Sequence, residues 1–232
     1  MPLDINRPIA LVGLMGVGKT TIGRRLAKRL SLPFYDSDDE IETASGRTVA
    51  SYFHKHGEAA FRDGERRVVE RLLGDDPIIL GTGGGAFIHP ETRKLLLEKS
   101  LTIWLKGDFD TLFERVSRNN KRPLLQVDDP KATFRKLMDE RYPIYANAHL
   151  TVNIAKGPHS RTVKRVARAI EIYLAEERGE TPKKHRRRHP STRRRSHNGQ
   201  KKQAKNGSPK ASKSNLQPQE NLAQKSLAKD SA

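Results

Sequence analysis

A stretch of eight residues near the N-terminus, Gly13 to Thr20, has the residue types and spacing of a phosphate-binding loop. It reads Gly-Leu-Met-Gly-Val-Gly-Lys-Thr and fits the pattern G-x-x-x-x-G-K-[ST] at every required position. Glycines let backbone N–H groups approach phosphate oxygens, and the start of a following helix adds partial positive charge. We expect Lys19 to reach the β- and γ-phosphates and the Thr20 hydroxyl to ligate Mg²⁺. The loop therefore predicts a site for a nucleoside triphosphate.

The segments around this loop predict the elements that must position it. Apolar residues at 9–12 indicate a buried strand before the loop, and four more strands are expected at 33–36, 78–81, 101–105 and 150–154. Helical patterns occupy about 20–29, 38–45, 58–73, 90–98, 108–118, 130–145 and 159–176. Strands that alternate with helices indicate an α/β fold, with a parallel sheet covered on both faces.

Ligands bind beyond the carboxyl ends of the strands in such a sheet, so the residues after each strand are candidates for chemistry. Asp36 and Asp38 follow the second expected strand and could hold Mg²⁺ through water and orient an acceptor hydroxyl. Alternatively, Ser37 or Asp38 is only the N-cap of the next helix. Asp108 is a weaker metal candidate, and it is equally suited to an N-cap.

Glycines and arginines complete the candidate set. Gly83 to Gly85 follow the third expected strand and indicate either a ligand pressed against bare backbone or a loose loop. Arg62, Arg122 and Arg141 are candidates for binding anions, although a single arginine is more often a surface charge. The basic segment before Arg122 could be a lid that closes on phosphate.

Charge is distributed unevenly along the 232 residues, whose net charge is +18. Residues 179–232 carry fifteen Lys or Arg against three acids and almost no large apolar side chain, so we expect a disordered basic tail. The folded domain is expected at 1–178. Cysteine is absent, which excludes disulfides and suits a reducing cytoplasm, and no apolar run is long enough to span a membrane.

Several short motifs occur in an order that closely resembles the shikimate kinases, over about residues 7–175. They are the phosphate-binding loop with Met15 inside it, Tyr-Asp-Ser-Asp, Phe-Arg-x-x-Glu, Gly-Gly-Gly, Arg-Pro-Leu-Leu and Arg-Tyr-x-x-Tyr. The resemblance implies a three-layer P-loop kinase fold with a five-stranded parallel sheet. It also implies transfer of the γ-phosphoryl group of ATP to the 3-hydroxyl of shikimate, on the route to aromatic amino acids, with one Mg²⁺ per subunit. We expect the protein to be a monomer.

The resemblance also implies roles for individual residues. Lys19, Asp38 and Arg122 take the catalytic positions, and Thr20 and Asp36 take the metal positions. The shikimate-binding positions are Asp38, Arg62, Gly83, Gly84, Gly85 and Arg141. The ATP-binding positions are Gly16, Val17, Gly18, Lys19, Thr20, Thr21, Arg115, Arg122 and Pro158. The chain departs from the family's Arg–Asn–Pro pattern at residues 156–159, where it reads Lys-Gly-Pro-His.

Two alternatives remain open at this point. One is another small-molecule kinase of the same fold, such as a gluconate kinase, although the glycines with Arg62 and Arg141 suit a polyhydroxy-carboxylate on bare backbone. The other is a nucleic-acid-associated protein whose basic tail is the binding element. No recognised nucleic-acid-binding module occurs in residues 1–178, so we expect no specific nucleic-acid partner, while weak binding of polyanions by the tail stays open.

Overall fold

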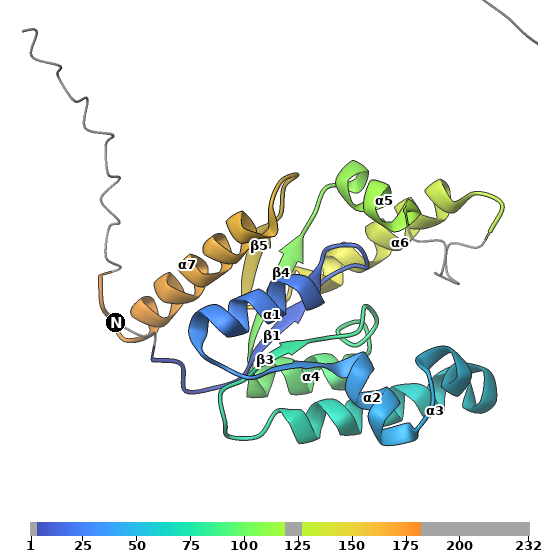
Figure 1. Ribbon diagram of the computed structural model, residues 1–232, viewed down its shortest axis with the longest axis horizontal. Coiled ribbons are helices and arrows are strands. Elements are labelled where there is room, and N and C mark those ends of the chain that lie inside the picture. The colour runs from blue at the N-terminus through green and yellow to red at the C-terminus, as the bar shows by residue number, and fades with distance from the viewer. Residues whose placement is uncertain (1–3, 119–126, 182–232) are drawn as a thin grey trace, which may run out of the picture. The chain divides into compact units, whose positions relative to one another are not determined.

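The computed structural model describes residues 4–118 and 127–181 (Figure 1). Its five strands form one parallel sheet in the order β2-β3-β1-β4-β5. The strands are β1 (Ile9–Val12), β2 (Phe34–Asp36), β3 (Ile79–Gly81), β4 (Leu101–Lys106) and β5 (Leu150–Asn153). This arrangement confirms the α/β fold class and the five-stranded parallel sheet predicted from the sequence.

Helices cover both faces of the sheet. They are α1 (Lys19–Leu30), α2 (Ser37–Ser45), α3 (Val49–Leu72), α4 (Pro90–Lys99), α5 (Phe109–Ser117), α6 (Pro130–Tyr145) and α7 (His159–Glu177). Helices α1 and α7 lie side by side on one face, whereas α3 and α4 pack together on the opposite side (Figure 1). The central strand β1 is buried at all four positions because helices exclude water from both of its faces.

The register of the sheet places three loops together at one edge. Leu11 of β1 pairs with Gly81 of β3, and Asp36 of β2 pairs with the same Gly81. The phosphate-binding loop after β1, the glycine-rich loop after β3 and the carboxylates that end β2 therefore lie next to one another.

The structure corrects one expected helix start and one alternative N-cap. Helix α3 begins at Val49 rather than at 58, because Gly57 takes up a kink (φ 78°, ψ 173°) that joins two helical segments. The N-cap of α2 is Asp36 rather than Ser37 or Asp38. Asp36 has extended backbone angles, and its carboxylate accepts a hydrogen bond from the Asp38 N–H at 3.2 Å.

Of the two alternatives for Asp108, the structure shows the N-cap, since its carboxylate accepts a hydrogen bond from the Thr111 N–H at 2.8 Å. This bond lowers the pKa of Asp108. Within residues 4–118 and 127–181, no helix combines the length and the apolar composition that crossing a bilayer requires.

Candidate functional site

The phosphate-binding loop is built from glycines with positive φ. The φ angles of Gly13, Gly16 and Gly18 are 139°, 81° and 90°. A Cβ atom on Gly13 would lie 2.8 Å from the Leu105 carbonyl oxygen, so that position requires glycine for space as well as for its backbone angle. Gly18 is also the N-cap of α1 and supplies no side chain, which leaves the N–H groups of the first turn directed at the loop's interior.

Lys19 folds back over this loop. Its Nζ donates hydrogen bonds to the Gly13 carbonyl at 2.7 Å and to the Leu14 carbonyl at 3.4 Å. The ammonium group therefore lies over the start of the loop, where it can donate to phosphate oxygens in place of the backbone carbonyl oxygens.

Two oxygen-bearing side chains meet beside the loop. The Thr20 hydroxyl donates to Asp36 Oδ2 at 2.7 Å. Hydroxyl and carboxylate oxygens are hard ligands of the kind that Mg²⁺ prefers, and this pair leaves most coordination positions to phosphate oxygens and water. Among the described residues no group of three or more His, Cys, Asp or Glu side chains could hold a metal ion. The Thr20 and Asp36 oxygens fit a Mg²⁺ ion whose remaining ligands are phosphate oxygens and water.

Asp38 lies two residues after Asp36, in a buried acidic environment. Burial raises its pKa to about 6, and the negative charges of Asp36 and Glu65 add to the increase, while Lys19 opposes it. A Cβ atom on Gly83 would lie 2.5 Å from Asp38 Oδ1, so the carboxylate packs directly on bare backbone. The Gly83 N–H donates to the Ser37 hydroxyl at 2.8 Å, which ties the glycine-rich loop to α2.

Arg62 of α3 approaches the same loop from one side. Its guanidinium lies where a side chain on Gly85 would be, 2.4 Å from the position of the missing Cβ atom. Its NH1 donates to Glu65 Oε2 at 2.7 Å, and both of its other nitrogens face Glu58 Oε1 at 3.4 Å. The Glu65 side chain is 1% exposed, and burial raises its pKa although Arg62 opposes the increase.

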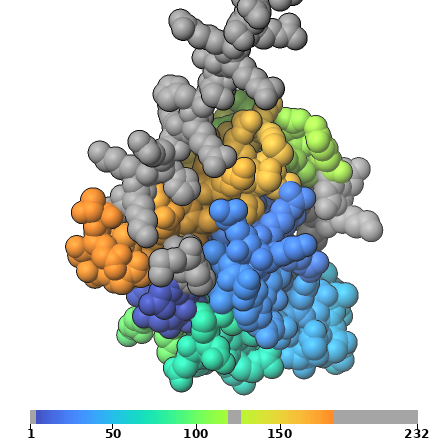
Figure 2. All heavy atoms as spheres, turned by 60° about the vertical axis from the view of Figure 1, so that its left-hand side comes forward, coloured from blue at the N-terminus to red at the C-terminus, as the bar shows by residue number. Residues whose placement is uncertain are grey.

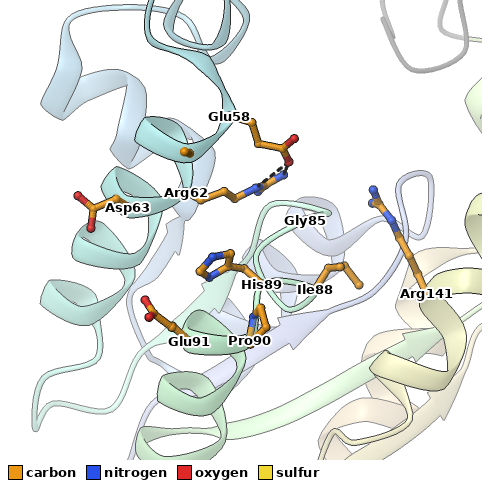
Figure 3. A pocket seen from close by; sticks show the side chains of 10 residues that line it. Glu58, Arg62, Asp63, Gly85, Ile88, His89, Pro90, Glu91 and Arg141 are labelled. Carbon is orange, nitrogen blue, oxygen red and sulfur yellow. Dashed lines mark hydrogen bonds and ion pairs between the residues drawn. The ribbon is translucent and has the colours of Figure 1, made fainter.

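Arg141 of α6 approaches from the other side. Its NH1 donates to the Gly84 carbonyl at 3.3 Å, and the buried Tyr145 hydroxyl donates to the same oxygen at 2.6 Å. Figure 3 shows Arg62 and Arg141 extending toward the Gly85 loop from opposite sides. Both arginines line a hollow of about 640 Å³ together with Glu58, Ala59, Asp63, Gly85, Ile88, His89, Pro90 and Glu91.

The remaining candidates lie beside the phosphate-binding loop or outside the described residues. Arg115 of α5 donates to the Gly16 carbonyl at 3.4 Å. Pro158 is the exposed N-cap of α7, and the neighbouring His159 ring packs against Gly18. The pKa of His159 is lowered by burial and by Arg115 and Arg25. Arg122 lies outside the described residues.

Ser37, Glu65 and Tyr145 each lie within a quoted motif, but no functional role was expected for them from the sequence. Glu65 lies four residues from both Phe61 and Val69, which puts it on a buried stripe of α3. A carboxylate on an apolar stripe was the signal that could have identified it. The hydrogen bonds of Ser37 and Tyr145 join elements far apart in the sequence, so the sequence carries no comparable signal for them.

Comparisons with known proteins bear on this arrangement. The family model for shikimate kinase matches residues 15–171. The chain is 49% identical over 176 residues to the shikimate kinase of Bradyrhizobium diazoefficiens, covering 76% of this chain and 85% of that protein. It is 47% identical over 180 residues to the shikimate kinase of Bartonella henselae, covering 78% of this chain and 86% of that protein.

Solved structures agree with these matches. The shikimate kinase of Acinetobacter baumannii in complex with shikimate superposes with a TM-score of 0.69 and 35% identity, covering 75% of this chain and 96% of that one. A gluconokinase from Sinorhizobium meliloti superposes with a TM-score of 0.52 and 17% identity over 76% of this chain and 98% of its own, a likeness of fold alone. The chain therefore belongs to the shikimate kinase family, the ATP-dependent kinases that transfer the γ-phosphoryl group to the 3-hydroxyl of shikimate.

Proposed function

We propose that the chain binds ATP on the loop Gly13–Thr20 and binds shikimate in the hollow between α3 and α6. The observation that carries this proposal is the convergence of Arg62 and Arg141 on the bare backbone of Gly84 and Gly85. These arginines belong to elements far apart in the sequence, and the edge of the sheet that they reach also carries the phosphate-binding loop.

The two arginines bind the carboxylate of shikimate. Planar guanidinium groups suit bidentate pairing with a carboxylate. Arg62 is held in place by Glu65 through one nitrogen at 2.7 Å, and its contacts with the exposed Glu58 are longer, at 3.4 Å. A substrate carboxylate can displace Glu58 because that side chain is 72% exposed and gains little from the pair.

The glycine-rich loop and Asp38 bind the ring and its hydroxyl groups. Gly83 to Gly85 let the ring lie against backbone, and Asp38 accepts a hydrogen bond from the 3-hydroxyl. A carboxylate with a pKa of about 6 is mostly ionised at pH 7 and is still a useful proton acceptor. The 3-oxygen forms a bond to the γ-phosphorus while the bond from that phosphorus to the β,γ-bridging oxygen breaks, and the proton passes to Asp38.

Positive charge around the transferring group supplies most of the catalysis, since phosphoryl transfer proceeds through a loose, anionic transition state. Lys19 provides one such charge when its ammonium group donates to phosphate oxygens instead of the Gly13 carbonyl. Arg122 provides another from its position in the Arg-Pro-Leu-Leu motif. Thr20 and Asp36 would hold Mg²⁺, Thr20 directly and Asp36 through water, and the ion would neutralise charge on the β- and γ-phosphates.

The adenine and ribose lie on the side of the loop where Arg115 and Pro158 are found. Arg115 already contacts the Gly16 carbonyl, and Pro158 precedes the His159 ring that packs on Gly18. We include Val17 and Thr21 in the nucleotide site because their N–H groups belong to the loop and to the first turn of α1.

Residues 1–178 form the kinase domain in this proposal, and residues 179–232 form a separate basic tail. The enzyme acts as a monomer in the cytoplasm, where ATP is available. A protein that ends at Arg178 is expected to keep the activity of the full chain within about twofold, since the tail supplies no group to the mechanism. Loss of activity in a truncated protein that still folds would show that the tail takes part in catalysis.

An assay of ADP release tests the assignment as a whole. We expect release only when Mg²⁺, ATP and shikimate are all present, with little release when gluconate, a nucleoside monophosphate or water is the acceptor. Turnover of gluconate without turnover of shikimate would contradict the proposed acceptor and favour the gluconate kinase alternative.

A further inference from the structure

Helices α1 and α7 carry eight basic side chains, seven of them exposed and Arg168 half-buried, which we name the α1/α7 basic face. These residues are Arg24, Arg25, Lys28 and Arg29 of α1, and Arg161, Lys164, Arg165 and Arg168 of α7. The two helices lie side by side on one face of the sheet, as Figures 1 and 2 show (α1 in blue, α7 in yellow-orange to orange). Ile22 and Leu26 of α1, with Val166 and Ile170 of α7, are buried, so the basic residues point away from the core.

The eight basic residues of this face account for the net positive charge of residues 1–178. Residues 1–178 contain thirty Lys or Arg against twenty-four Asp or Glu. Without the eight basic residues of the face, the same residues would contain two more acids than bases. No acidic residue occurs in residues 19–30 or 159–170. The charge is therefore a local property of two helices rather than an average of the domain.

The spacing of these residues brings like charges together. Arg24 and Lys28 lie four positions apart, as do Arg25 and Arg29, and α7 repeats this spacing twice over its first half. Like charges at this separation destabilise a helix. By contrast, Arg66 of α3 lies within 4 Å of Asp63, Glu70 and Glu91. The α1/α7 basic face thus carries a cost in stability that α3 avoids by pairing.

Acidic neighbours do not offset this cost for most of the face. Arg24 pairs with Asp39 at 3.5 Å, and Arg168 pairs with Glu171 at 2.8 Å. Among residues 4–118 and 127–181, no ion pair involves Arg25, Lys28, Arg29, Arg161, Lys164 or Arg165. These side chains keep their charge available for an external anion.

We propose that the α1/α7 basic face binds the phosphodiester backbone of duplex nucleic acid without sequence preference. Rows of exposed Lys and Arg bind such a backbone mainly by releasing its condensed counterions. The large hydrophobic side chains exposed on the described part of the chain are Tyr35 and Val127, and neither lies on α1 or α7. The face therefore lacks the apolar anchors of a membrane-binding helix and the aromatic groups that stack on unpaired bases. Residues 179–232, which follow α7, have the same sign of charge.

Two variants of the full chain distinguish binding by the α1/α7 basic face from binding that depends on net charge alone. In the face variant, Lys28→Gln, Arg29→Gln, Lys164→Gln and Arg165→Gln remove four charges from the face. In the matched control, Lys94→Gln, Lys99→Gln, Lys131→Gln and Lys136→Gln remove four exposed charges from α4 and α6. Both variants keep Gln, a good helix former, at every changed position. Activity with shikimate and ATP should be unchanged in both, because none of the eight residues belongs to the proposed mechanism.

Binding is measured by fluorescence anisotropy with a labelled DNA duplex of about 20 base pairs, over a series of salt concentrations. We expect the face variant to bind at least about tenfold more weakly than the wild type, and the slope of log K against log salt to fall by about three. The control is expected to stay within about threefold of the wild type. An RNA duplex of the same length is expected to bind comparably, since the backbone is the ligand.

Three results would overturn the proposal. Failure of the wild-type chain to bind either duplex at low salt would show that the face has no such ligand. Equal losses in the two variants would assign binding to net charge or to residues 179–232 rather than to the face. Tighter binding to vesicles that contain anionic phospholipid than to either duplex would assign the face to a membrane surface instead.

Discussion

The two halves of the candidate active site are built in different ways. The nucleotide half comes from one continuous stretch, Gly13–Thr20, and uses mainly backbone groups and the end of a helix. The acceptor half draws on α2, α3, α6 and the loop after β3, and it uses charged side chains that are half-buried or buried.

This difference has an energetic consequence. Backbone N–H groups at a helix start are fixed dipoles, and holding them toward an anion needs no buried charge. The acceptor half instead holds Asp38 and Glu65 in surroundings that raise the pKa of each carboxyl group. We therefore expect substitutions in the nucleotide half to affect mainly catalysis, and those in the acceptor half to affect stability as well as binding.

The largest expected effect is that of Lys19→Ala. It removes the positive charge proposed to face the transferring phosphoryl group, and we expect kcat to fall by about a thousandfold. Shikimate affinity, measured by calorimetry, should stay within about threefold of the wild-type value because Lys19 lies outside the acceptor half. Lys28→Ala, an exposed change on the same helix, is the control for the loss of one charge. A kcat within tenfold of the wild type would contradict the role of Lys19.

The paired variants Arg62→Ala and Arg141→Ala probe the acceptor half. Each should weaken shikimate binding by about 3 kcal/mol, as the loss of one buried charge pair does. Only Arg62→Ala should also lower the free energy of unfolding, by about 3 kcal/mol, because it leaves the buried Glu65 carboxylate without its partner. Arg141 donates to a carbonyl that also accepts from Tyr145, so its loss leaves that oxygen satisfied.

Calorimetry for shikimate and urea unfolding measure these two properties separately. A double variant, Arg62→Ala with Glu65→Gln, is expected to recover part of the stability lost in Arg62→Ala, without recovering shikimate affinity. Equal stability of Arg62→Ala and Arg141→Ala would mean that Glu65 does not depend on Arg62, and the contrast between the two halves would lose its energetic basis.

The same contrast explains what the sequence could predict. The five strands and the nucleotide half followed from local patterns, since contiguous apolar runs and a contiguous glycine motif carry their meaning within a few residues. Asp38, Arg62 and Arg141 were candidates from the sequence, but their shared role in binding the acceptor followed only from the resemblance to a family, because the fold brings them together. The sequence around a single arginine or carboxylate does not predict whether the fold buries that side chain.

The start of α3 shows a second kind of limit. Residues 49–56 are mostly polar or exposed, so the helix there has little apolar periodicity, and Gly57 is a poor helix former. The structure continues the helix across Gly57 through a kink, with Thr48 accepting a hydrogen bond from the Ser51 N–H at 3.2 Å. A capping threonine was visible in the sequence, but tertiary packing decides whether such a segment stays helical.

Asp38→Asn is expected to raise stability at high pH while it abolishes most activity. The pKa of Asp38 is about 6 in the folded protein against a model value of 3.8, so the folded state binds this proton more tightly than the unfolded state. The carboxyl group therefore costs no stability below pH 3.8, and its cost grows as the pH rises through this window to about pH 6 and is constant above it.

The variant should thus be more stable than the wild type by about 3 kcal/mol at pH 8, and by about 1 kcal/mol at pH 4.5. Urea unfolding at the two pH values measures this difference, with Asp39→Asn on the exposed side of α2 as the control. A gain in stability that is the same at both pH values would mean that the surroundings do not disfavour the ionised form of Asp38.

The smallest expected effect is that of Gly84→Ala. This variant tests the backbone at which the acceptor half borders the phosphate-binding loop. A Cβ atom on Gly84 would have the Met15 nitrogen as its nearest neighbour, at 3.9 Å, so the free protein has room for the methyl group. Because alanine restricts the unfolded chain more than glycine, stability should be unchanged or higher by about 0.4–1 kcal/mol. Shikimate affinity should nevertheless fall about tenfold, since the methyl group would occupy the surface on which we place the ring, a loss of about 1.4 kcal/mol.

Gly83→Ala is the contrasting variant, because its Cβ atom would lie 2.5 Å from Asp38 Oδ1 and should destabilise the free protein as well. Thermal unfolding measures stability, and calorimetry with shikimate and with a non-hydrolysable ATP analogue measures the affinity for each ligand. Unchanged shikimate affinity in Gly84→Ala would show that the ring does not lie on this backbone. A loss of nucleotide affinity instead would show that Met15 transmits the change into the phosphate-binding loop, so the two halves would not be independent at Gly84.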